Sequence, residues 1–225
     1  MLPGVLSLMT LRASAACTTS HSNVEGNNTG NTAVFGNRGD ISINSGINYS
    51  GLSNSIHRSL FVRGSGTSSS GGFLNDVEVG WTANNGGHTN PQLYFEWVDR
   101  GTDTNVRFNR DLTSAIGTNP NFRVQDSNGD MIWSAFYGSE SNNFDNTPVL
   151  NFSVGRAITN SERRNTCDSQ FAHFNNLRAC LIRNPCTWPT YSVLSCYAVT
   201  GTTNYNFAKI SDAEHLVTTG SGIRC

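Results

Sequence analysis

Two glutamates, Glu78 and Glu96, are the residues of this 225-residue chain whose type and spacing come closest to a catalytic arrangement. They lie in the segment VEVGWTANNGGHTNPQLYFEWVDRG (77–101), where two alternating apolar and polar stretches flank a loop rich in Asn and Gly. A carboxylic acid beside a carboxylate is what glycoside hydrolysis uses, with about 5 to 9 Å between the groups. The same pair would also suit a peptidase that activates water.

The two stretches are predicted to form neighbouring antiparallel strands. Side chains in a strand alternate between its faces, so in Val77–Trp81 the apolar residues share one face and Glu78 takes the other. In Leu93–Val98 the apolar residues likewise oppose Glu96. A hairpin that pairs Trp81 with Leu93 places Glu78 directly opposite Glu96, with Cβ atoms about 5 Å apart.

Two interpretations of this pair stay open at the level of sequence. Like charges so close repel, so one carboxyl would be driven toward its protonated form, as an acid–base pair requires. Alternatively, Arg63 on the preceding predicted strand, or Arg107 just beyond, neutralises one Glu as an ion pair. A two-residue slip of register would also separate the carboxylates.

The leading functional hypothesis is an extracellular protein that binds a glycan or another cell-surface polymer. Tyr94 shares a predicted face with Glu96, and the neighbouring loop supplies Asn84, Asn85 and His88. Aromatic rings stack on apolar sugar faces, while amide and acidic groups bind hydroxyls. The alternatives are a hydrolase that uses the Glu78–Glu96 pair, and a structural or coat protein without a small ligand.

Length and charge limit the remaining classes. A chain of 225 residues fits one larger all-β domain. The net charge is -1 and no basic stripe is evident along the sequence, so a nucleic-acid partner is not expected. Neither a cofactor nor a metal is expected either: DSNGD (126–130) is predicted to be a hairpin turn, because Met131 and Tyr137 stand where a calcium loop needs Gly and Glu.

The N-terminus and the cysteines predict export. Residues 1–16, MLPGVLSLMTLRASAA, resemble a truncated signal peptide with an A-x-A cleavage site, which leaves 17–225 as a single mature domain. No later apolar run is long enough to span a bilayer. Six cysteines without zinc-type spacing predict up to three disulfides in a secreted protein; they are Cys17, Cys167, Cys180, Cys186, Cys196 and Cys225.

The predicted fold is an all-β antiparallel sandwich of the jelly-roll or concanavalin-like type, because many short alternating stretches are separated by turn residues. One helix is expected over 168–183, where Asp168 could cap the start and Phe171, Phe174, Leu177 and Leu181 recur at helical spacing. Such a helix would hold Cys167 and Cys180 about 20 Å apart and exclude a bond between them.

Residues 75–105 resemble the central segment of the neprosin family, through Gly80-Trp81, Leu93–Trp97 and the Thr102 region. The chain also resembles uncharacterised secreted β-sandwich proteins that carry a VEVGW strand. The resemblance implies a secreted β-sandwich related to glutamic peptidases. The first catalytic Glu of that family has no counterpart in SNSIHRS (53–59), and the Trp-Gly-Gly-Glu motif that holds the second does not occur here. Glu78 and Glu96 would therefore need to form a site of their own.

Overall fold

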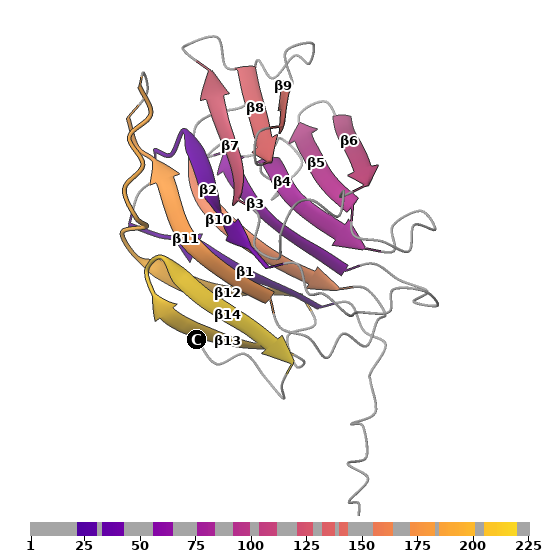
Figure 1. Ribbon diagram of the computed structural model, residues 1–225. Helices are drawn as coiled ribbons and strands as arrows, with labels where there is room; N and C mark the ends of the chain where they lie inside the picture. The colour runs from indigo at the N-terminus through magenta and orange to yellow at the C-terminus, as the bar shows by residue number, and fades with distance from the viewer. Residues whose placement is uncertain are drawn as a thin grey trace, which may run out of the picture.

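The computed structural model contains two antiparallel sheets of seven strands each, stacked face to face (Figure 1). It describes residues 22–30, 33–42, 56–64, 76–83, 92–99, 104–111, 121–127, 132–137, 140–143, 155–163, 172–182, 185–200 and 205–219. Sheet A has the order β12-β1-β10-β3-β4-β5-β6, and sheet B has the order β13-β14-β11-β2-β7-β8-β9.

The strand bounds of sheet A, in chain order, are β1 Ser22–Asn28, β3 Ile56–Gly64, β4 Asp76–Ala83, β5 Gln92–Asp99, β6 Thr104–Asp111, β10 Gly155–Arg163 and β12 Leu194–Thr200. Those of sheet B are β2 Gly36–Ile41, β7 Asn121–Ser127, β8 Ile132–Tyr137, β9 Glu140–Asn143, β11 Ala172–Cys180, β13 Tyr205–Ser211 and β14 Glu214–Thr219. The predicted strands at 77–81 and 93–98 are confirmed.

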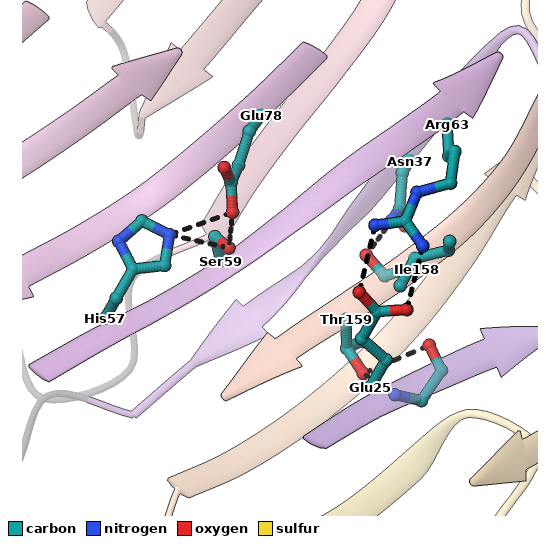
Figure 2. Close-up of polar contacts among 9 residues, drawn as sticks. Glu25, Asn37, His57, Ser59, Arg63, Glu78, Ile158 and Thr159 are labelled. Atoms are coloured by element: carbon teal, nitrogen blue, oxygen red, sulfur yellow. Dashed lines mark hydrogen bonds and ion pairs between the residues drawn. The ribbon is translucent and has the colours of Figure 1, made fainter. Parts of the chain in front are cut away.

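One apolar core lies between the sheets. Trp81 of β4 and Leu93 of β5 in sheet A belong to the same buried cluster as Phe122 of β7 and Phe174 of β11 in sheet B. Asn37 of β2 joins the layers, because its amide donates to two backbone carbonyls of sheet A at 3.1 and 3.0 Å (Figure 2). The predicted all-β antiparallel sandwich is confirmed at this level.

The helix predicted over 168–183 is wrong, because Ala172–Cys180 form strand β11. The strand contains a β-bulge: its register against β2 shifts between Asn175 and Arg178, and Asn176 has a φ of 53°. The extra residue lets Phe174 and Leu177, three positions apart, both face the core. A spacing of three is typical of a helix, and here a bulged strand produces it.

The disulfide prediction is confirmed in part. Cys180 bonds Cys186, six residues along the chain, and Cys196 is also disulfide-bonded. The predicted separation of Cys167 from Cys180 was based on the helix, so it no longer has a basis. Cys17, Cys167, Cys225 and the predicted signal peptide lie outside the described residues. None of the described segments forms a helix long and apolar enough to cross a membrane.

Candidate functional site

The predicted register of β4 and β5 is confirmed. Trp81 pairs with Leu93, and Glu78 lies directly opposite Glu96. Because Trp81 and Leu93 face the core, the two glutamates occupy the outer face of sheet A. Only 8% of Glu78 and 5% of Glu96 is exposed to solvent. Residues in direct cross-strand pairs have Cβ atoms about 4.5 to 5.5 Å apart, so these two partly desolvated carboxylates are immediate neighbours.

Strand β3 supplies hydrogen-bond donors to Glu78 (Figure 2). His57 Nε2 lies 2.8 Å from Glu78 Oε1, and the Ser59 hydroxyl donates to the same oxygen. His57, Ser59 and Phe61 alternate along β3 with core residues such as Leu60, and Phe61 is the register partner of Glu78. Donors aimed at a carboxylate oxygen stabilise its ionised form. These contacts act in favour of the charged form of Glu78, against its burial and the charge of Glu96.

His57, Ser59 and Glu78 do not form a nucleophilic triad. In a Ser–His–acid triad, the serine and the acid meet opposite nitrogens of the imidazole ring. Here Ser59 Oγ lies 3.1 Å from His57 Nε2, and Glu78 contacts that same nitrogen. The serine proton is directed to Glu78, so His57 does not activate Ser59 in this arrangement. The chemistry available is that of the carboxylates.

Arg63, considered as an ion-pair partner for the glutamate pair, instead binds Glu25 of β1. Its guanidinium donates two hydrogen bonds to the two carboxylate oxygens, at 3.0 and 2.9 Å (Figure 2). Burial of Arg63 opposes its charge, but attraction to Glu25, with further attraction from Asp76 and Glu78, outweighs burial and raises the pKa of Arg63. A positive charge thus stands on the same face as the pair, while its direct contacts go to Glu25.

The other predicted partner, Arg107, is the register neighbour of Glu96 on β6. The backbone therefore places Arg107 on the same outer face, while its side chain lies outside the described part of the chain. The ion-pair interpretation of Glu96 stays a prediction.

The predicted binding residues are only partly located. Tyr94 lies on β5 opposite Gly80 of β4, which puts it on the face that carries Glu96. Its side chain is outside the described residues, and so are Asn84, Asn85 and His88 entirely. Among the residues that are described, no group of three His, Cys, Asp or Glu side chains could hold a metal ion.

Sequence reasoning missed His57, Ser59 and Glu25 as members of this face. Alternation in IHRSLFVRG (56–64) could have placed His57, Ser59 and Arg63 on one side of a strand. That alternation could not say that β3 lies beside β4. Glu25 is 38 residues from Arg63 and reaches it across β10, so no local signal connects the two.

Comparisons with known proteins show similarity in solved structures only. No protein-family model and no curated protein matches the chain. A glycoside hydrolase family 16 endo-glucanase from Bacteroides ovatus aligns with a TM-score of 0.41 and 4% identity, over 64% of this chain and 66% of that one. A lichenase from a mouse hindgut metagenome aligns with a TM-score of 0.35 and 8% identity, over 64% and 67% of the two chains.

A kappa-carrageenase from Pseudoalteromonas carrageenovora aligns with a TM-score of 0.33 and 8% identity, over 84% of this chain and 65% of that one. The chain thus spans about two thirds of the length of these enzymes. Similarity at this level transfers neither an active-site residue nor an activity, so the function of the site depends on its own geometry.

Proposed function

We propose that the outer face of sheet A binds an extracellular glycan and that Glu78 and Glu96 hydrolyse it. The observation that carries this proposal is the direct pairing of two nearly buried glutamates across β4 and β5. Like charges directly opposite one another destabilise a sheet. Glycoside hydrolysis is a reaction that uses two neighbouring carboxyl groups of this kind.

The contacts of each glutamate suggest its role. Ser59 donates to Glu78 and His57 Nε2 contacts the same oxygen, which suits the carboxylate that attacks or stabilises the sugar C1 carbon. Glu96 then carries the proton for the leaving oxygen and, as a base, later takes a proton from water. Retaining glycosidases separate their carboxyl groups by about 5 to 5.5 Å and inverting enzymes by more. Direct cross-strand pairing favours the retaining geometry.

Several predictions from the sequence belong to this proposal. Tyr94 has a position on the same face and would stack on a sugar ring, and Asn84, Asn85 and His88 would contribute from the loop between β4 and β5. A secreted protein of jelly-roll or concanavalin-like fold would meet such a polymer outside the cell.

The test is a comparison of charge-neutral variants. Wild-type protein should release reducing ends from at least one member of a panel of neutral and sulfated polysaccharides. Glu78→Gln and Glu96→Gln should each abolish turnover, because removing one member of a coupled pair removes most of its effect. Glu214→Gln, which makes the same charge change on β14 of sheet B, should retain full activity.

Other outcomes assign a different function. If wild type binds a polysaccharide but releases no reducing ends, the protein is a glycan-binding protein and the hydrolase is rejected. If it cleaves denatured casein and no glycan, with the same loss in both Gln variants, the pair serves a peptidase of the kind that the neprosin resemblance implies. Equal activity of Glu78→Gln and wild type on every substrate would refute any catalytic role for the pair.

A further inference from the structure

Three arginines stand in one row across sheet B. Arg178 of β11 lies directly opposite Arg38 of β2, and Arg38 lies directly opposite Arg123 of β7. The strands are neighbours in the sheet (Figure 1). Asn37 on β2 faces the core, so the alternation of the strand puts Arg38 on the outer face, away from the Glu78–Glu96 pair. All three arginines are partly exposed.

The row is electrostatically unfavourable by itself. Adjacent strands are about 4.8 Å apart, and like charges directly opposite one another destabilise a sheet. Burial and the charge of Arg178 both lower the pKa of Arg38, and burial and the charge of Arg38 lower the pKa of Arg123. Within the described part of the chain, neither Arg38 nor Arg178 forms a salt bridge.

The acid nearest in register does not resolve the imbalance. Asp40, two residues from Arg38 on the same face, attracts it. However, its two carboxylate oxygens accept hydrogen bonds from Asn121 at 2.8 Å and Asn176 at 2.5 Å. Asp40 is thus engaged in holding the neighbouring strands, and its single negative charge lies beside Arg38, which also faces the positive charge of Arg178.

The fold also holds these side chains in place. The Arg38 guanidinium carbon lies 5.0 Å from the centroid of the Trp188 ring, and Arg178 donates a hydrogen bond to the Trp188 carbonyl at 3.0 Å. Trp188 packs over Gly36, where a Cβ would lie 2.9 Å from the indole ring. A planar cation stacked on an aromatic ring keeps its edge free to donate in the ring plane.

The bulge in β11 directs Arg178 to this face. Ala172 and Phe174 are buried, so strict alternation would also bury residue 178. The extra residue at Asn175 and Asn176 reverses the alternation, and Leu177 becomes buried while Arg178 turns outward. Bulges of this kind re-aim side chains and are frequent beside binding sites.

We propose that Arg38, Arg123 and Arg178 form an oxyanion-binding site that takes the sulfate or carboxylate groups of an acidic polysaccharide. Guanidinium groups bind planar and tetrahedral oxyanions through two parallel hydrogen bonds, and an anion bound among the three would offset their mutual repulsion. A row that crosses three strands spans about 10 Å, so it suits one or two anionic groups rather than the long track of a nucleic-acid strand. The site is on the other sheet from the proposed hydrolytic pair. The arginine geometry carries the oxyanion site, and the choice of a polysaccharide as its carrier rests on the proposed function.

The experiment is a titration of the full-length protein at low salt with dextran sulfate, polygalacturonate, unmodified dextran and sodium sulfate. Wild type should bind at least one of the two acidic polymers and not dextran, and salt should weaken that binding by screening. Arg38→Gln should reduce affinity by about tenfold or more, the effect of losing one charge-assisted two-point contact. Arg38→Lys keeps the charge but loses the planar guanidinium, so its affinity should lie between those of wild type and Arg38→Gln.

Lys209→Gln is the control, because it removes one positive charge from an exposed residue on β13, at the edge of sheet B and away from both proposed sites. It should bind as wild type does. Thermal unfolding should show Arg38→Gln at least as stable as wild type, since it relieves repulsion. If Arg38→Gln proves unstable, Arg123→Gln provides the same binding test.

Four results would overturn the proposal. One is the failure of wild type to bind either acidic polymer. A second is an equal loss of affinity in Arg38→Gln and Lys209→Gln, which would indicate binding to overall charge. A third is an affinity for free sulfate ions that equals or exceeds the affinity for the polymers per anionic group, which would reject the polysaccharide as the ligand. The fourth is tighter binding to a DNA duplex of equal charge, with the same dependence on Arg38.

Discussion

Acidification should weaken this fold through His215, a titratable residue in the core. Its ring is stacked between Phe174 and Phe207, with centroid distances of 4.7 and 4.4 Å. Its Nε2 atom lies 2.7 Å from the Thr159 hydroxyl, and only 1% of the residue is exposed. Burial, with a further contribution from His173, lowers the pKa of His215 from 6.5 to about 3.

The difference between the folded and unfolded pKa values of His215 determines how stability changes with pH. Above the unfolded pKa of His215, the ring is neutral in both states and stability does not depend on its titration. As the pH falls below that value, the unfolded chain takes up a proton that the folded chain refuses, so unfolding becomes easier. Each pH unit costs about 1.4 kcal/mol, so the loss reaches about 3 kcal/mol at about pH 4.5 and about 5 kcal/mol near the folded pKa.

His215→Phe isolates this contribution. The substitution replaces the imidazole with a ring that cannot titrate, between two other aromatic rings. Thr159 keeps a partner, because its hydroxyl also accepts the Gly26 N–H at 3.1 Å. Carboxylates that titrate in the acid range do so in both proteins and cancel in the difference.

The measurement is the free energy of unfolding in guanidinium chloride, with disulfides intact, between about pH 7.5 and about pH 4.5 at constant ionic strength. The stability of wild type relative to His215→Phe should fall by about 3 kcal/mol over that range. A second variant, His215→Gln, checks that the result does not depend on the size of the new side chain. Parallel pH profiles for wild type and both variants would refute the buried neutral imidazole.

Three further predictions concern contacts that join separate strands. Glu25→Gln should lower the free energy of unfolding by about 3 kcal/mol, because it leaves the largely buried Arg63 guanidinium without its carboxylate. Glu78→Gln relieves repulsion from Glu96 and should change the free energy of unfolding by less than about 1 kcal/mol. Equal losses for the two variants in denaturant titrations would contradict this assignment. Asn37→Ala should cost at least about 3 kcal/mol in the same assay, since it removes the partners of two buried carbonyls and of the Tyr191 hydroxyl; a loss below about 1 kcal/mol would show that the sheets do not need this link. Asn176→Val should cost about 1 to 2 kcal/mol, because its φ of 53° is unfavourable for a branched side chain, whereas unchanged thermal stability would argue against the bulge.

The sequence alone was sufficient to predict the local order of β4 and β5. Apolar residues at alternate positions leave only even shifts of register if both apolar sets are to face the core. The alternation therefore placed Glu78 and Glu96 on one face and allowed them to be opposite each other. The structure decided among the even registers and contains the one that pairs them directly.

The same kind of reasoning failed for β11, where the pattern of apolar residues was ambiguous. Phe174 and Leu177 are three positions apart, and a helix or a bulged strand can bury both. Only the neighbouring strand decides between them: Asp40 of β2 binds the Asn176 side chain at the bulge, and backbone pairing with β2 extends the segment. A local pattern cannot contain that information, because the partner is 136 residues away.

The tertiary structure alone decided which distant charges meet. Alternation assigned faces within each strand, but strand order brought His57 and Ser59 beside Glu78, and Glu25 to Arg63 across β10. The row of Arg38, Arg123 and Arg178 combines three segments far apart in the chain, so no basic stripe was visible in the sequence. The physical reason is that side-chain period is a local property of the backbone, whereas the neighbours of a strand depend on how the whole chain closes its core.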